Sequence, residues 1–167
     1  DVCNVKCRHC YNFWREENDQ TNHMEREQFD RLVDELVKAE VFHVILSGGE
    51  PFAKFELLEY GFKKLQENNI SVSCNTNLML ATDDRIKRLM NVGVDHILTS
   101  LTSHDPETND FMLHQEGAFP KIIEGIKIAT RNGMRVSANI VVGPKNLAHV
   151  YETGLLAHQL GCQKVFG

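Results

Sequence analysis

The chain has 167 residues, of which 42% are apolar and 25% are charged, and its formal net charge is −5. This ordinary composition predicts one folded domain with a real core and excludes a disordered chain or a disulfide-rich miniprotein. The mild acidity argues against nucleic acid as a partner, and no apolar run approaches the roughly 18 residues of a membrane span.

Short apolar strands alternate with amphipathic helices along the chain. Residues 25–38 carry apolar side chains at the i, i+3, i+4, i+7 spacing of a core-facing helix, and the β-branched run at residues 41–46 predicts a buried strand that runs into glycines. The same patterns predict further helices around 55–65, 86–90, 122–129 and 147–160, and further strands at 70–74, 95–101, 135–142 and 164–166. This alternation indicates right-handed βαβ units in a parallel sheet, as a barrel, a partial barrel or a doubly wound α/β fold.

Polar or glycine-rich segments follow the predicted strands. They are "SGGEP" (47–51), "NTN" (75–77), "SLTS" (100–103) and "VGPKN" (142–146). Ligands of parallel α/β folds bind beyond the carboxyl ends of the strands, so we expect a site there. The longest irregular connection, 102–118, is expected to be a functional loop.

The five cysteines form one cluster and two isolated positions. "CNVKCRHC" contains Cys3, Cys7 and Cys10, while Cys74 and Cys162 stand alone. An odd count without a secretion signal predicts a reduced, cytoplasmic setting, in which clustered thiols bind metal or do chemistry. We interpret the two isolated cysteines as small apolar residues of the core.

Three close thiols leave three interpretations. A disulfide between two of them is disfavoured by a reducing setting. A structural zinc site needs a fourth ligand, such as Cys74 or a histidine. A four-iron cluster held by three thiolates leaves one iron open, which is what a catalytic centre needs.

The "SGGEP" segment has the composition of a ligand-binding turn. Gly48 and Gly49 allow unusual dihedral angles and close approach to a ligand. Glu50 can accept hydrogen bonds from a cationic amine, and Pro51 fixes the exit of the turn. A plain strand-to-helix turn would also use glycine and proline.

The C-x3-C-x2-C spacing, with "SGGEP" directly after the first predicted strand, resembles the radical S-adenosylmethionine (radical SAM) superfamily. The resemblance implies that Cys3, Cys7 and Cys10 hold a [4Fe-4S] cluster whose fourth iron binds S-adenosylmethionine. Reductive cleavage of that cosubstrate would give a 5′-deoxyadenosyl radical that takes hydrogen from a substrate. An electron donor such as flavodoxin or ferredoxin is implied as a partner. The implied fold is a partial (β/α)6 barrel, and we expect the chain to be trimmed at both ends, without the first family strand.

Weaker similarities extend the implied cofactor site. They place these residues near S-adenosylmethionine: His9, Tyr11, Gly48, Gly49, Glu50, Asn75, Thr76, Asn77, Ser100, Asn139 and the backbone of Val141. The stretch 74–101 is most similar to members with SPASM or twitch domains, which implies a peptide, a protein or a small precursor as substrate. The alternatives are an enzyme of cofactor biosynthesis and a non-catalytic zinc or iron–sulfur module.

The departures from the family pattern lie on the substrate side. Leu78 replaces the glycine of a "TNG" motif, and Thr102-Ser103 stand where "DG" is common. Phe13 and Trp14 are expected to cover the cysteine loop, and the acidic run 16–19 to be solvated.

Overall fold

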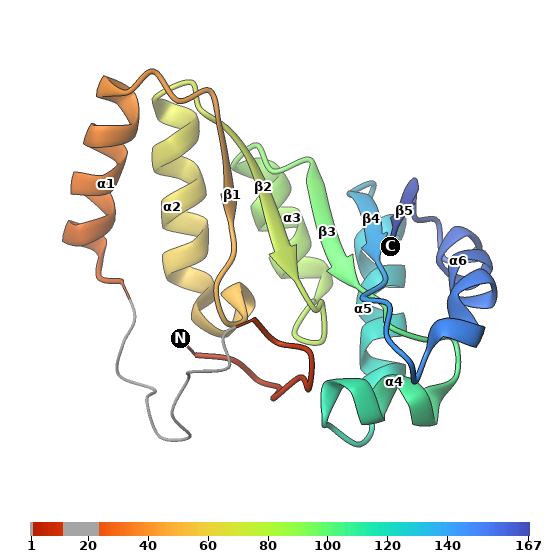
Figure 1. The fold of residues 1–167 in the computed structure, drawn as a ribbon. Coiled ribbons are helices and arrows are strands. Elements are labelled where there is room, and N and C mark those ends of the chain that lie inside the picture. The colour runs from red at the N-terminus through yellow and green to blue at the C-terminus, as the bar shows by residue number, and fades with distance from the viewer. Residues whose placement is uncertain (1, 12–23) are drawn as a thin grey trace.

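The computed structural model describes residues 2–11 and 24–167, so Phe13, Trp14 and the acidic run 16–19 lie outside the described residues. Five parallel strands form one sheet in the order β1-β2-β3-β4-β5 (Figure 1). The strands are β1 (His43–Leu46), β2 (Ser71–Thr76), β3 (His96–Ser100), β4 (Arg135–Asn139) and β5 (Lys164–Phe166). The predicted parallel sheet is confirmed.

Helices connect successive strands, as the apolar periodicity predicts. They are α1 (Arg26–Lys38), α2 (Phe55–Glu67), α3 (Asp83–Asn91), α4 (Pro106–Leu113), α5 (Ala118–Arg131) and α6 (Val150–Gln159), with 3₁₀ turns η1 (Pro51–Lys54) and η2 (Leu147–His149). Within the described ranges, no helix is long and apolar enough to cross a membrane.

The strand order decides between the architectures that periodicity leaves open. Right-handed connections between consecutive neighbouring strands place every connecting helix on the same face of the sheet, as in a (β/α) barrel. A doubly wound sheet would instead reverse its strand order at a switch point. The sequential order therefore gives the wall of a partial barrel, with the helices outside.

The connection 102–118 is not irregular, so that part of the expectation is wrong, whereas its functional role stays a prediction. It contains α4, whose N-cap Asp105 accepts a hydrogen bond from the Thr108 N–H at 2.8 Å. Pro106 occupies the first turn, where a missing N–H is tolerated, and His114 ends the helix in the left-handed conformation. The Asp-Pro pair is typical of a helix N-terminus, but the apolar stripe of this helix is too short for periodicity to predict it.

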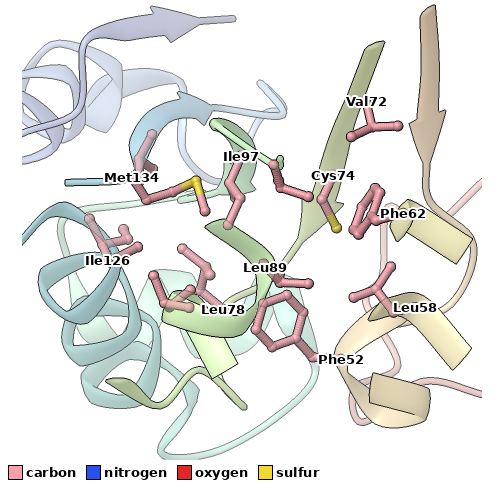
Figure 2. Packing of buried hydrophobic residues seen from close by; sticks show 14 of the residues in the cluster. Phe52, Leu58, Phe62, Val72, Cys74, Leu78, Leu89, Ile97, Ile126 and Met134 are labelled. Atoms are coloured by element: carbon pink, nitrogen blue, oxygen red, sulfur yellow. The ribbon is translucent and has the colours of Figure 1, made fainter. Parts of the chain in front are cut away.

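The core lies between the sheet and its outer helices (Figure 2). Cys74 of β2 points toward Phe62 of α2 and is fully buried, and Cys162 is 4% exposed. Burial raises the pKa of the Cys74 thiol and raises that of Cys162 to about 11. The prediction that both isolated cysteines are core residues is confirmed.

Helix α5 approaches the loop after β2 unusually closely. Leu78 is fully buried and has φ 57°, in the left-handed region that the glycine of a "TNG" motif adopts without strain. Its carbonyl oxygen lies against Gly125, where an added Cβ would be 2.1 Å away. The leucine at this position is therefore accommodated by a glycine on the facing helix.

Candidate functional site

The "SGGEP" turn lies at the carboxyl end of β1. Gly48 has φ 141°, which a residue with a side chain rarely adopts. A Cβ added at this position would have no other atom within 4 Å. A cavity of about 580 Å³ is lined by the turn together with residues of α1, η1 and α2, among them Gln28, Lys54 and Leu57. In the described part of the chain, the backbone carbonyls of the two glycines of the turn accept no hydrogen bond from a backbone N–H. The turn thus presents bare backbone to a cavity.

The Glu50 carboxylate faces inward and is 3% exposed. Its Oε1 accepts hydrogen bonds from the Phe52 N–H at 2.9 Å and the Thr76 hydroxyl at 2.6 Å, and its Oε2 accepts from the Asn77 N–H at 2.8 Å. Burial raises the pKa of Glu50, and these three donors oppose the rise. The side chain therefore links the turn after β1 to the end of β2.

The cysteine loop is fastened to both of these strand ends. The Glu50 N–H donates to the Val2 carbonyl at 2.8 Å, and the Asn77 side-chain amide donates to Asn4 Oδ1 at 2.7 Å. Val5, between the first two cysteines, is 4% exposed and anchors the loop in the protein. These contacts hold residues 2–5 against the carboxyl edge of the sheet.

The far end of the cysteine loop is fastened to α4. The Arg8 N–H donates to the Met112 carbonyl, and Arg8 Nε donates to the Phe111 carbonyl, both at 2.9 Å. The Arg8 guanidinium also lies 4.3 Å from the centre of the Phe111 ring, which Lys145 approaches to 5.0 Å. The loop, red in Figure 1, therefore crosses the strand ends from the β1 side to α4.

The three loop thiols fit a multinuclear cluster by their chemistry. Cys3, Cys7 and Cys10 are partly exposed, and the Cys10 N–H closes a turn onto the Cys7 carbonyl at 3.1 Å. Among the described residues, no three His, Cys, Asp or Glu side chains converge on a single metal ion. Thiolates of a four-iron cluster bind different iron atoms, so they need not converge on one point. A polar atom beside them, His9 Nδ1, is buried without a hydrogen-bond partner in the described part of the chain.

The other expected cofactor residues occupy the same edge of the sheet. Ser100 and Asn139 are register partners across β3 and β4, and Asn75 lies near the end of β2. The Val141 carbonyl already accepts a hydrogen bond from the Asn146 side chain at 2.9 Å, while Tyr11 is 64% exposed. Their contacts with S-adenosylmethionine stay predictions.

Sequence reasoning missed a polar network on the inner face of the sheet. The ring of His43 bonds Ser71 Oγ at 3.1 Å and Ser73 Oγ at 3.2 Å, and His96 Nε2 bonds Ser137 Oγ at 2.9 Å. Burial lowers the pKa of His96, which favours its neutral form. The signal was the alternation of polar residues with core residues along each strand, which places them on the face away from the helices.

The sequence patterns also did not reveal the residues that fasten the loops. Asn4 and Arg8 stand between the cysteines, where only their ligand spacing drew attention. The Asn146 side-chain amide donates a hydrogen bond to the Thr102 carbonyl at 2.7 Å. Its Oδ1 accepts one from the Gly143 N–H at 2.8 Å, which closes the local turn. No local pattern distinguishes such side chains from ordinary loop polarity, because their partners are distant in sequence.

Two curated relatives match nearly the whole chain. The chain is 27% identical over 162 residues to an AdoMet-dependent heme synthase of Methanosarcina barkeri, covering 95% of the chain and 45% of that protein. It is 28% identical over 167 residues to a PqqA peptide cyclase of Methylocella silvestris, covering 98% and 43%. The chain thus spans less than half the length of these relatives.

A solved structure shares the fold. Streptococcus suis SuiB, bound to its precursor peptide SuiA, superposes with a TM-score of 0.81 at 18% identity, over 98% of this chain and 36% of SuiB. The family model of the radical SAM superfamily matches residues 1–157. The chain with its cysteine loop fastened across the strand ends therefore belongs to the radical SAM superfamily.

Proposed function

We propose that this chain is the catalytic core of a radical SAM enzyme in which Cys3, Cys7 and Cys10 hold a [4Fe-4S] cluster. The supporting observation is that the one loop that carries these three partly exposed cysteines is hydrogen-bonded to the turn after β1 and to the end of β2. When bound, the cluster and S-adenosylmethionine would supply hydrogen abstraction driven by one-electron reductive cleavage of the cosubstrate.

The protein residues act by binding and positioning. The carbonyls of Gly48 and Gly49 would accept hydrogen bonds from the amino group of S-adenosylmethionine, while the buried Glu50 carboxylate already accepts from Thr76 and Asn77. Glu50 instead keeps the turn at a fixed distance from β2. A charge-assisted bond from a cationic amine to a fixed carbonyl orients the cosubstrate without a mobile side chain.

The polar strand ends bind the rest of the cosubstrate. Ser100 and Asn139, adjacent in register, offer a hydroxyl and an amide to its ribose or carboxylate. His9 and the backbone near Val141 lie on the adenine side. These assignments follow the family resemblance at the matching positions.

We propose a peptide or protein as the substrate, in a reaction of the SPASM-type maturase class. The likeness to a PqqA peptide cyclase and to SuiB with a bound precursor peptide supports this choice. The second candidate is cofactor biosynthesis, which the likeness to an AdoMet-dependent heme synthase and an Fe-coproporphyrin III synthase favours.

Anaerobic reconstitution of the full protein tests the activity. We expect about four irons per chain, as one [4Fe-4S] cluster requires, and 5′-deoxyadenosine on reduction with S-adenosylmethionine. Alanine at Cys3, Cys7 or Cys10 should abolish both, whereas Cys162→Ala, a matched change in the core, should keep both. Stoichiometric zinc and no 5′-deoxyadenosine would instead identify a non-catalytic zinc module.

The substrate class is tested by whether a probe raises the rate of 5′-deoxyadenosine formation above the rate measured without substrate. SuiA or PqqA peptide serves as the peptide probe and Fe-coproporphyrin III as the tetrapyrrole probe, each with reduced flavodoxin or ferredoxin as the electron donor. We expect the peptides to raise 5′-deoxyadenosine formation. A rise with the tetrapyrrole alone would favour cofactor biosynthesis.

A further inference from the structure

His9 carries a buried polar atom that the fold itself does not explain. Its Nδ1 is buried and has no hydrogen-bond partner in the described part of the chain. Buried polar atoms in native proteins almost always have a partner, because leaving one unpaired costs its full desolvation. An orphan of this kind therefore indicates a group that binds there.

The position of His9 narrows what that group is. The residue lies between Cys7 and Cys10, in the turn that the Cys10 N–H closes onto the Cys7 carbonyl at 3.1 Å. The neighbouring Arg8 fixes the same turn to α4 through its backbone and its guanidinium. A cluster held by both thiols would lie beside the residue between them.

Imidazole chemistry supplies the matching interaction. A neutral histidine has one N–H donor, and the tautomer protonated at Nδ1 directs that donor from the orphaned position. Thiolate and sulfide sulfurs accept hydrogen bonds, and these bonds are among the features that set the reduction potential of iron–sulfur clusters. Reduction adds negative charge to the cluster, so a donor at its sulfur favours the reduced form.

We propose that the His9 Nδ1–H donates a hydrogen bond to a sulfur of the cluster that Cys3, Cys7 and Cys10 hold, and so raises its reduction potential. This inference rests on the proposed function. It concerns one edge atom of the ring and leaves the ring faces free for the adenine contact expected from the family resemblance.

Three substitutions at His9 test it. His9→Phe keeps a planar ring without a donor. His9→Asn places an amide nitrogen where Nδ1 lies, whereas His9→Gln reaches only the place of Nε2. The midpoint potential of the reconstituted full protein is measured by EPR-monitored redox titration without S-adenosylmethionine.

We expect His9→Phe and His9→Gln to lower the equilibrium constant for cluster reduction about tenfold, which for one electron is about 59 mV. His9→Asn should retain the wild-type potential. If the Phe variant fails to hold iron, the comparison of Asn with Gln still decides, because both carry the same amide group.

Equal potentials in all variants that hold about four irons would overturn the inference. Weaker binding of S-adenosylmethionine by His9→Phe at an unchanged potential would also overturn it, because the nitrogen would then serve the cosubstrate. Absence of a cluster in the wild-type protein would refute the proposed function instead, so the two failures are distinguishable.

Discussion

Glu50→Gln is the sharpest test of how the site is built. The glutamine oxygen can replace Oε1 and keep the bonds from the Phe52 N–H and the Thr76 hydroxyl. Its nitrogen then faces the Asn77 N–H, so the 2.8 Å bond to Oε2 is lost and two donors oppose each other. The change is isosteric, which isolates the hydrogen bonding from the packing.

The magnitude follows from opposing terms. Loss of a hydrogen bond to a charged group costs about 1.5–3 kcal/mol. Removal of a buried negative charge offsets part of this, because burial already raises the pKa of Glu50. We expect a net destabilisation of about 1–2 kcal/mol for Glu50→Gln, and about 3–5 kcal/mol for Glu50→Ala, which leaves all three donors unpaired.

The assay is urea unfolding, followed by circular dichroism and compared through the transition midpoint at equal slope. The matched control is Glu56→Gln, because Glu56 is 71% exposed in its ion pair with Arg88. Exposed pairs contribute about 0–1 kcal/mol. If Glu50→Gln were no more destabilising than this control, the carboxylate would not link the two strand ends.

The pH dependence of stability also tests Glu50, because the direction of the change with pH depends on whether the pKa is raised or lowered. The pKa of Glu50 is raised above its ordinary value of 4.5, so the folded protein binds that proton more tightly than the unfolded chain. The stability of the wild type relative to Glu50→Gln should therefore increase as the pH falls through the raised pKa toward 4.5. A difference that shrank on acidification would contradict the assigned desolvation.

Three further outcomes are expected. Gly125→Ala should cost about 2–4 kcal/mol in urea unfolding, because its Cβ meets a backbone carbonyl, whereas Gly154→Ala, with open space around it, should be neutral or stabilising; equal effects would contradict the close approach. Hydrogen bonds from an arginine and an asparagine lower the pKa of Asp83 to about 2, so the stability that Asp83→Asn removes at neutral pH should decline in the wild type as the pH falls from 3.8 toward 2; an undiminished difference in thermal unfolding at pH 2 would refute this. A double-mutant cycle of Asn4→Ala and Asn77→Ala should show a coupling of about 1 kcal/mol, and strict additivity would mean that their 2.7 Å bond does not hold the loop.

Much of the fold could be read from local patterns. The spacing of Phe29, Leu32, Val33 and Leu36 gave α1, and β-branched runs gave the strands to within a few residues. Predicted strand 135–142 ends at Asn139, because pairing with β5 stops there. Helix α4 was missed because its weak apolar stripe gave periodicity little to detect.

Local patterns indicated the candidate ligands, whose roles stay predictions, and missed the residues that hold those ligands in place. The spacing of the three cysteines and the glycine turn are local in sequence, so a single chain reveals them. The bonds that place them, such as Glu50 to Thr76 and Asn77 to Asn4, join residues far apart in the chain. Local patterns therefore gave no sign that the Glu50 carboxylate is buried and accepts hydrogen bonds from Thr76 and Asn77, while its contact with a cationic amine stays a prediction.

The sequence by itself determined the α/β alternation, the three-thiol loop and the glycine turn, because helix periodicity, strand composition and ligand spacing are properties of neighbouring residues. The tertiary structure alone decided the strand order, the inward use of the Glu50 carboxylate and the fastening of the cysteine loop between the strand ends and α4. It also exposed the orphaned His9 Nδ1. These depend on which distant donors meet which acceptors when the core closes, and no local pattern encodes that pairing.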